Sequence, residues 1–471
     1  MKERILKVLY VTIISLWCCS TIFAGLQSRV DAIIGAPSQS KVTYSVVILD
    51  AATGRNLYKH NANAALIPAS NMKLVISAAA LKYLGGDYQY VTKVGMLNNS
   101  LIVTGSGDPL LGDKKTDDIY GRKGGWVFDA IMEAIREQGI EKVGDIIVDT
   151  TVFDDERVNP NWPVEQLNNW YAAEVSGVNY NVNCIDLTTV NNGGRVIIEM
   201  DPVTKYVKLR NEVAAASDGK GAVGAYRQSG KPNELLVRGK CSKKQGPFSV
   251  TVERPGAFLG YMIYEHMTSN GIEVTGRLLE QGVEEKSYVG LCSFETSIWD
   301  VMRRCNKDSL QLAAEAMLKT ISAEKTQGKG GNWAHGREII SEYLMSLGIS
   351  SDQFRIDDAS GLSRENRLSA ASIAAVLRDV YQNESWDKFK ATFAVGGVDG
   401  TLVRYFKQGG YQGKVMGKTG YISGVMSFSG VCETARGEIL FSIITNNNWQ
   451  GRKYLNDITI AVIDEFGSPV E

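Results

Sequence analysis

Apolar residues recur almost without interruption in the stretch IPASNMKLVISAAALKYLGG, residues 67–86. Pro68 is suited to the first turn of a helix, and the pair Gly85-Gly86 is suited to its end. Apolar side chains at this density cover most of a helix surface; they are Met72, Leu74, Val75, Ala78, Ala79 and Leu81. The pattern therefore predicts a helix that is buried on most sides.

Runs of apolar and β-branched residues predict strands near both ends of the chain. Residues 41–60 are typical of two strands joined by a turn at Thr53-Gly54. Residues 425–434 and 437–448 are typical of two more strands, and residues 453–466 follow with the spacing of an amphipathic helix. We therefore expect the two ends of the chain to form halves of one domain.

The segment between these halves mixes both patterns. Residues 125–140 predict a helix and residues 142–153 a strand, with further strand-like runs at 194–200 and 233–239. Nothing in this segment has the composition of a low-complexity linker, and no internal repeat is visible. It is therefore expected to fold as structure inserted into the main domain.

The first residues differ from the rest of the chain. A basic start, MKERILK, precedes an apolar run and a small residue, which is the pattern of a secretory signal peptide over residues 1–24. A retained membrane anchor is the competing interpretation. We expect export to the periplasm or outside the cell, a main domain of residues 25–86 plus 293–471, and one or two inserted domains, two being favoured, over residues 87–292.

Composition narrows the possible functions. The 471 residues are 44% hydrophobic and 22% charged, as in an ordinary globular protein, and the net charge of −1 gives no support to a nucleic-acid partner. Five of the seven cysteines follow the signal, odd in number and widely spread, so no disulfide framework or metal site is predicted. The three histidines, His60, His266 and His335, are scattered, which disfavours a histidine-based serine triad.

One serine and one lysine at the start of the residue 67–86 helix could carry chemistry. Residues three apart share a helix face, so Lys73 can place its amine beside the Ser70 hydroxyl. The Ser-x-x-Lys spacing alone decides nothing, because it also begins at Ser38, Ser217, Ser322 and Ser385. Only the Ser70 copy opens a long apolar helix, where burial and a nearby cation would make lysine a base. The alternative is a helix-capping serine beside a solvated lysine.

Two later segments complete a possible site. Lys418-Thr419-Gly420 precede an apolar strand, and there a glycine lets a substrate backbone approach while Lys and Thr can donate to an anionic oxygen. Ser309 and Gln311 stand near the start of a helix-like segment, CNKDSLQLAAEAMLK. Taken singly, each segment is equally consistent with a strand-edge turn or a helix cap.

In the order Ser70-x-x-Lys73, Ser309-x-Gln311 and Lys418-Thr419-Gly420, the chain resembles the penicillin-recognising serine enzymes. It is most similar to the penicillin-binding protein 4 type of D-alanyl-D-alanine carboxypeptidase and endopeptidase, peptidase family S13. Stretches at 105–111, 357–369 and 394–402 also look like that family. The resemblance implies an α/β (α+β) transpeptidase domain of the serine β-lactamase and DD-peptidase type, with an antiparallel sheet flanked by helices and smaller domains inserted.

The resemblance also implies a role for each residue. Ser70 would attack the penultimate D-alanine carbonyl, Lys73 would accept its proton, and the backbone amides of Ser70 and Tyr421 would stabilise the oxyanion. Ser309 would relay a proton to the leaving amine. Lys418, Thr419 and Gly420 would form the substrate-binding strand, with Lys418 and Thr419 holding the terminal carboxylate. Gln311 would hold a substrate amide; the family has Asn at this position, and Gln keeps the amide but adds one methylene.

Partners and alternatives follow from the same resemblance. Peptidoglycan peptides are the expected substrates, β-lactams the expected inhibitors, and no cofactor or metal is required. A peripheral contact with the cell envelope is an open expectation. A serine β-lactamase is a rival interpretation, although the nearest segment to its general-base motif, residues 365–369, ends in Ser. A cell-wall binding module that has lost catalysis is another.

Overall fold

The computed structural model describes residues 25–217, 219, 221–228, 230–284, 288–328 and 330–467, so the expected signal peptide lies outside the described residues. The chain forms two compact units. Unit 1 consists of Met1–Ala79, Arg303–Ser309 and Ile340–Glu471, and unit 2 of Ala80–Met302 and Leu310–Ile339. Within the described ranges, no helix combines the length and the apolar character needed to cross a membrane.

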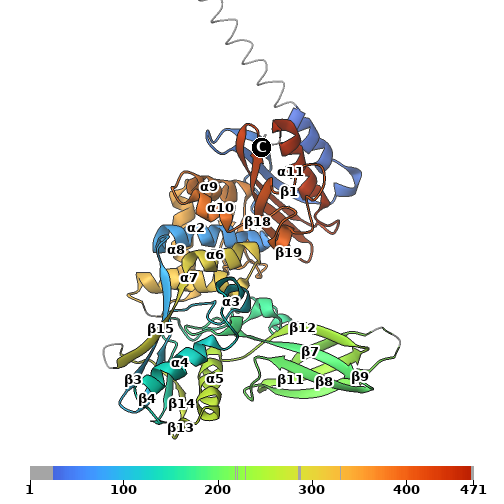
Figure 1. The fold of residues 1–471 in the computed structure, drawn as a ribbon. Coiled ribbons are helices and arrows are strands. Elements are labelled where there is room, and N and C mark those ends of the chain that lie inside the picture. Colours follow the sequence, from blue (N-terminus) through green and yellow to red (C-terminus); the bar gives the residue numbers. More distant parts are fainter. Residues whose placement is uncertain are drawn as a thin grey trace, which may run out of the picture. The chain divides into compact units, whose positions relative to one another are not determined.

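A six-stranded sheet forms the centre of unit 1 (Figure 1). All of its neighbouring strands pair antiparallel. In spatial order the strands are β18 (Ala394–Val395), β19 (Val415–Ile422), β20 (Val425–Thr434), β21 (Gly437–Asn446), β1 (Thr43–Asp50) and β2 (Asn56–His60). Because β18 pairs only with Met416 and Gly417, the remainder of β19 forms an open edge of the described sheet.

Helices cover both faces of this sheet. On one face α11 (Lys453–Phe466) buries its apolar side against Val46, Phe441 and Ile443. On the other face α9 (Ala370–Tyr381) packs on β1 and β21. The unit also contains a helical segment at 25–34, α10 (Trp386–Ala391), the strand pair β16 (Phe354–Arg355) and β17 (Arg367–Leu368), and parts of α2 (Met72–Leu84), α6 (Ile298–Lys307) and α8 (Trp333–Ser346). The chain passes between the units within these last three helices and again between Ser309 and Leu310.

Unit 2 is built on a five-stranded sheet and helices packed on it. The strand order is β14 (Leu278–Glu280), β6 (Ile146–Asp149), β4 (Ser100–Thr104), β3 (Gln89–Leu97) and β15 (Val289–Ser297), with the pair β5 (Lys142–Val143) and β13 (Glu273–Val274) nearby in sequence. Its helices are α3 (Lys114–Tyr120), α4 (Trp126–Glu137), α5 (Pro255–Ser269) and α7 (Gln311–Lys325).

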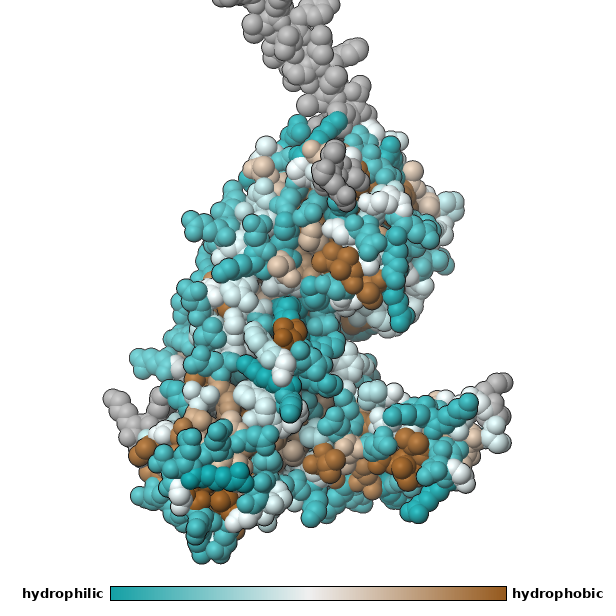
Figure 2. Space-filling view, viewed as in Figure 1, coloured by the Kyte–Doolittle hydropathy of each residue, from teal (hydrophilic) through white to brown (hydrophobic). Residues whose placement is uncertain are grey.

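Two three-stranded sheets form a further part of unit 2 (Figure 1). One has the order β10 (Val223–Gln228), β11 (Lys231–Cys241), β9 (Lys208–Ala215), and the other the order β12 (Lys244–Thr251), β7 (Cys184–Asn192), β8 (Arg195–Asp201). A single cluster of buried apolar side chains, including Ile135, Phe258 and Val237, joins this part to the helices. On the face drawn in Figure 2 the surface is mainly hydrophilic, with small separate apolar patches.

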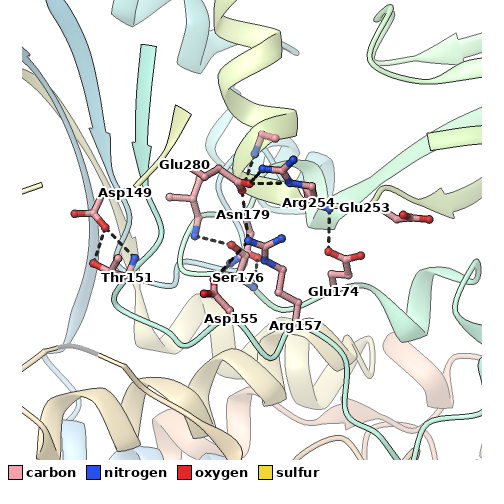
Figure 3. Close-up of polar contacts among 12 residues, drawn as sticks. Asp149, Thr151, Asp155, Arg157, Glu174, Ser176, Asn179, Glu253, Arg254 and Glu280 are labelled. Carbon is pink, nitrogen blue, oxygen red and sulfur yellow. Dashed lines mark hydrogen bonds and ion pairs between the residues drawn. The ribbon is translucent and has the colours of Figure 1, made fainter. Parts of the chain in front are cut away.

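A polar junction fixes the start of α5 in unit 2 (Figure 3). Glu280 accepts a hydrogen bond from the Ala257 amide at 3.1 Å and another from Arg254 Nε at 2.9 Å. The Arg254 amide donates to Glu174, whose carboxyl pKa is raised by burial. Arg157 also lies 3.8 Å from the Glu280 carboxylate. The junction satisfies the buried carboxylates and ties β14, α5 and the preceding loops together.

Most of the elements expected from the sequence are present. The strands expected in residues 41–60, 425–434 and 437–448 and the helix at 453–466 correspond to β1, β2, β20, β21 and α11. The prediction of one strand over 142–153 was wrong, because the chain forms β5 and β6 with Gly144 and Asp145 between them. The segment beginning at Cys305 was expected to be one helix, but α6 ends at Lys307 and α7 begins at Gln311.

Candidate active site

Ser70 lies in a tight turn directly before α2. The turn is a 3₁₀ helix, Ala69–Asn71, so the α-helix itself begins at Met72 rather than at Pro68. Ala69 has φ +46°, a left-handed conformation that is unfavourable for a residue with a Cβ atom. The sequence therefore builds a strained turn that presents Ser70 at the N-terminus of a buried helix, where the macrodipole favours negative charge.

Lys73 places its amine against the Ser70 hydroxyl. Its Nζ lies 3.1 Å from Ser70 Oγ and donates to the Ser360 carbonyl at 2.6 Å, and its side chain is fully buried. This is the geometry expected from the three-residue spacing on one helix face. The alternative of a capping serine beside a solvated lysine does not describe this pair, because Lys73 is fully buried and bonded to Ser70 Oγ.

The loop that carries Ser360 is organised by a buried carboxylate. Asp358 accepts from the amides of Gly361 and Ser363, at 2.7 Å each, and from Asn366 Nδ2 at 2.6 Å. Gly361 has φ +80°, and a Cβ there would lie 1.9 Å from the Ala69 carbonyl oxygen. The loop can therefore pack directly on the Ser70 turn, which places the Ser360 carbonyl beside Lys73.

Side chains of the sheet hold the same turn from the other side. Asn71 donates to the Lys418 carbonyl at 2.7 Å and accepts from Ser429 at 2.7 Å. The Ser427 hydroxyl donates to the Pro68 carbonyl at 2.6 Å. These three bonds fix the position of the Ser70 turn against β19 and β20.

Gly420 lets β19 approach the turn closely. A Cβ at this position would lie 2.1 Å from Ser427 Oγ and 2.9 Å from the Ser70 amide nitrogen. No other residue type leaves the required space. The open strand edge and the Ser70 amide are thus brought together without an intervening side chain.

Lys418 and Ser309 form the second pair of the site. Lys418 Nζ donates to Ser309 Oγ at 2.9 Å and to the Thr419 carbonyl at 2.7 Å, and the Lys418 side chain is fully buried. Ser309 lies not in a helix but in the break between α6 and α7, with φ +63°. The break turns its hydroxyl toward the lysine of β19, 109 residues away in sequence.

The electrostatics of the site are dominated by two buried amines. The pKa of Lys418 is well below its usual value, first because of burial and second because of the positive charge of Lys73. Repulsion between two charges is mutual, so a proton on one amine disfavours a proton on the other. Such a pair can keep one amine available to accept a proton.

Thr419 and Tyr421 have different surroundings from Lys418. Side chains alternate along a strand, and Thr419 is paired with Phe428 while Lys418 is paired with Ser429. Thr419 Oγ1 lies 2.9 Å from Thr401 Oγ1. The Tyr421 side chain is 65% exposed. Its backbone follows Gly420 directly along the strand edge.

Gln311 is the first residue of α7 and belongs to unit 2. Its side-chain oxygen is buried and accepts no hydrogen bond from the described residues. Of the sequence-predicted residues, the structure brings Ser70, Lys73, Ser309, Lys418 and Gly420 together within unit 1. The role of Gln311 stays a prediction.

Several residues that hold the Ser70 turn and the neighbouring loop were not predicted from the sequence. Asn71 and Ser427 act through bonds to residues nearly 350 positions away or more, and Asp358 acts inside a polar loop. The signal that could have found Asn71 is its place between Ser70 and Lys73 on a helix predicted to be buried, since a buried amide needs partners. Within the described part of the chain, no group of His, Cys, Asp or Glu is arranged to hold a metal ion, and all five cysteines there are free.

A family model settles the class of protein. The model of the D-Ala-D-Ala carboxypeptidase 3 (S13) family matches residues 26–466. The chain belongs to this family. Its match extends across both units and includes the Ser70, Ser309 and Lys418 segments.

Relatives of this S13 chain extend over most of its length. A D-alanyl-D-alanine carboxypeptidase of Actinomadura sp. (strain R39) is 28% identical over 90% of this chain and 81% of its own. The D-alanyl-D-alanine carboxypeptidase DacB of Haemophilus influenzae is 24% identical over 80% of both chains. All but a small part of the S13 chain is therefore matched by curated enzymes.

Solved structures confirm the fold class. Penicillin-binding protein 4 from Haemophilus influenzae matches with a TM-score of 0.78 and 22% identity, over 93% of this chain and 99% of the other. The same protein in complex with a β-lactam matches with a TM-score of 0.72 and 21% identity over the same shares. The expected α/β fold with an antiparallel sheet flanked by helices is thus confirmed.

Proposed function

We propose that this S13 protein is a serine DD-peptidase that cleaves D-Ala-D-Ala termini, D-Ala cross-links or both in peptidoglycan peptides, through an acyl-enzyme on Ser70. The observation that carries the proposal is the 3.1 Å contact between Ser70 Oγ and the buried amine of Lys73. Family membership and the carboxypeptidase relatives support the substrate class.

Acylation begins with attack of Ser70 Oγ on the carbonyl carbon of the penultimate D-alanine. The hydroxyl proton passes to neutral Lys73, and the Ser360 carbonyl holds that amine in position. Once Lys73 is protonated, the same carbonyl still accepts its hydrogen bond and stabilises the charge that forms. Because like charges repel each other, a positive charge on Lys418 would favour the neutral form of Lys73 before the reaction.

The oxyanion of the tetrahedral intermediate is placed against the backbone amides of Ser70 and Tyr421. The first amide lies at the N-terminus of α2, where the helix dipole supports negative charge. The second lies on the open edge of β19 next to Gly420, whose missing side chain leaves room for the substrate backbone. Preorganised donors of this kind contribute about 3–4 kcal/mol each to transition-state stabilisation.

Ser309 relays a proton to the leaving D-alanine amine, because its hydroxyl is already hydrogen-bonded to Lys418. Lys418 and Thr419 bind the terminal carboxylate, and Gln311 holds a substrate amide. The bond between the carbonyl carbon and the leaving nitrogen then breaks, and water hydrolyses the ester on Ser70. The same attack on a β-lactam ring leaves the leaving nitrogen tethered, so β-lactams bind covalently.

Labelling with a fluorescent penicillin tests the nucleophile. Ser70→Ala is expected to abolish covalent labelling and to cost only about 0.5–2 kcal/mol of stability, since one hydroxyl is removed at a helix start. Ser322→Ala is a matched control, because it has the same Ser-x-x-Lys spacing but its hydroxyl bonds to His335 and the Asn332 amide. Labelling that persists in Ser70→Ala would assign the nucleophile elsewhere.

Incubation with purified muropeptides tests the reaction. Loss of a terminal D-alanine from monomers indicates carboxypeptidase activity, and conversion of cross-linked dimers to monomers indicates endopeptidase activity. Rapid release of the penicillin label would instead favour a β-lactamase, and absence of labelling a binding module. Activity that disappears with EDTA would contradict a mechanism based on Ser70 and Lys73.

Export and domain organisation complete the proposal. An enzyme of peptidoglycan works outside the cytoplasmic membrane, which supports export through a signal over residues 1–24. We assign residues 25–86 with 293–471 to the catalytic domain and residues 87–292 to inserted domains. Mass analysis of the mature N-terminus and limited proteolysis would test these boundaries.

A further inference from the structure

A groove lies between two strand edges in unit 2. β10 and β12 are the end strands of their sheets, so each has one edge without a strand partner in the described residues. Asn168 closes the space between them, because its side chain donates to the Ala225 carbonyl of β10 and its backbone oxygen accepts from Thr251 of β12. The resulting cavity measures about 490 Å³, within the size range of small-molecule sites.

Two exposed aromatic rings border this groove. Trp170 is 40% exposed and Tyr226 is 44% exposed, and both line the cavity. Trp170 packs edge-on against Tyr171 with ring centroids 5.7 Å apart. The Arg238 guanidinium lies 4.5 Å from the Tyr226 ring centroid. These contacts hold each ring in place before any ligand arrives, which lowers the entropy cost of binding.

The remainder of the lining is uncharged, and its polar side chains are Asn168, Asn169 and Ser249. No Asp, Glu, Lys, Arg or His is among the described residues that line the cavity. The side-chain nitrogens of Asn168 and Asn169 donate to backbone carbonyls, whereas their side-chain oxygens accept no hydrogen bond from described residues. The groove thus offers aromatic faces, free amide oxygens and strand edges to a neutral ligand rich in hydroxyl and amide groups.

We propose that this groove binds the glycan strand of peptidoglycan, through its N-acetylated hexosamines. Sugar rings present C–H faces that stack on aromatic side chains, and their hydroxyl and acetamido groups match free amide oxygens and strand-edge backbone groups. The inference rests on the proposed function, to which it adds a second contact with the same polymer.

A stem peptide fits the groove less well. Stem peptides carry free carboxylates, and the lining supplies no cation to bind them. A peptide strand would also need a continuous edge for pairing, but residues 168–170 already cover the Val250 end of β12 through the Asn169–Val250 bridge. The neutral lining therefore selects sugar over peptide.

Titration calorimetry of the mature chain with oligomers of N-acetylglucosamine tests the proposal. Saturable binding is expected, and Trp170→Ala or Tyr226→Ala should weaken it about tenfold or more, as is usual for an aromatic binding anchor. Trp170→Phe should retain most of the binding, which separates loss of the ring from misfolding. Tyr264→Ala is the matched control, because Tyr264 is 38% exposed in unit 2 and does not line this groove.

Three results would overturn the proposal: no saturable binding by the unaltered chain, equal binding by Trp170→Ala, or preferential binding of sugar-free stem peptide. Penicillin labelling serves as the independent readout. Labelling and turnover of small D-Ala-D-Ala peptides should be unchanged in Trp170→Ala, whereas turnover of polymeric peptidoglycan should fall. If the unaltered chain binds glycan but is not labelled by penicillin, the result would contradict the proposed peptidase function and leave the glycan proposal intact.

Discussion

Two fully buried lysines, one in each unit, show how the groups around a buried amine determine its role. Lys319 of unit 2 donates to the Asp154 carboxylate at 2.6 Å and lies 3.9 Å from the centroid of the Trp333 ring. Lys418 of unit 1 donates to a hydroxyl and a carbonyl, with Lys73 as a nearby cation. Both side chains are fully buried, but the Lys319 amine is bonded to a carboxylate, whereas the Lys418 amine is bonded to a hydroxyl and a carbonyl.

The pKa of both lysines is lowered, and the difference lies in the causes of the two shifts. Burial lowers the pKa of Lys319, and Asp154 opposes that shift. Burial also lowers the pKa of Lys418, and the charge of Lys73 lowers it further. A carboxylate therefore offsets part of the desolvation of Lys319, whereas buried lysines bonded to hydroxyls and close to another cation are suited to exchange protons. This contrast is open to experiment.

The largest expected effect is on catalysis through Lys73. Lys73→Met should slow acylation by fluorescent penicillin by about 10²–10⁴-fold, since a positioned general base is removed. Time-resolved gel labelling measures the rate. Lys325→Met is the control, because Lys325 ends the Ser322-x-x-Lys copy and is exposed. Unchanged acylation in Lys73→Met would contradict the assignment of Lys73 as the general base.

Stability should respond in opposite directions to the loss of the two amines. Lys319→Met leaves Asp154 without its partner and should lower the free energy of unfolding by about 1–3 kcal/mol, a value reduced by the partial exposure of that carboxylate. Lys418→Met removes a poorly compensated buried amine and should leave that free energy unchanged or raise it by about 1–3 kcal/mol. Denaturant unfolding measures both, and equal destabilisation would contradict the comparison.

The sign of the pH dependence follows from the lowered pKa of Lys418. The unfolded chain keeps this proton up to pH values near the usual 10.5, whereas the folded chain releases it at lower pH. Between these pH values the unfolded state binds more protons, so stability due to this group rises with pH. Acylation should likewise rise with pH, because Lys73 must be neutral to accept the Ser70 proton. In Lys418→Met the midpoint of this rise should move upward, because a positive neighbour is lost; an unmoved midpoint would argue against coupled amines.

The smallest expected effect concerns Gln311. Gln311→Ala should slow acylation by the equivalent of about 0.5–1.5 kcal/mol, because one oriented hydrogen bond to substrate is lost. Gln311→Asn tests the geometry: restored or improved acylation would make Gln311 a tolerated variant, and failure equal to Ala would indicate a backbone adapted to the longer side chain. If neither change affects the rate, Gln311 lies outside the site.

The sequence predicted those parts of the site that local periodicity controls. Ser70 in the 3₁₀ turn and Lys73 in the first turn of α2 are three residues apart, so their contact follows from helical spacing. The pairing of Ser309 with Lys418 was reached only through motif order, because no local pattern relates residues 109 positions apart. The position of Ser309 in a helix break was missed, since the apolar periodicity continues on both sides of it.

The strand pairing in unit 2 could not be predicted from the sequence pattern, for a different reason. Strand-like runs in β8 and β11 were recognised, but their partners were not. β11 pairs antiparallel with β10 and parallel with β9, and a parallel partner requires a crossover that local alternation does not encode. The aromatic groove depends on that arrangement, because its two edges come from different sheets.

The missing side chain at Gly420 also limits how this protein can change under antibiotic pressure. Even a methyl group at residue 420 would lie 2.1 Å from Ser427 Oγ and 2.9 Å from the Ser70 amide. A substitution that excluded a β-lactam at this point would at the same time displace the nucleophile turn. We therefore expect no substitution of Gly420 to give resistance with retained activity. Any side chain there that prevents β-lactam binding would also prevent the reaction with substrate.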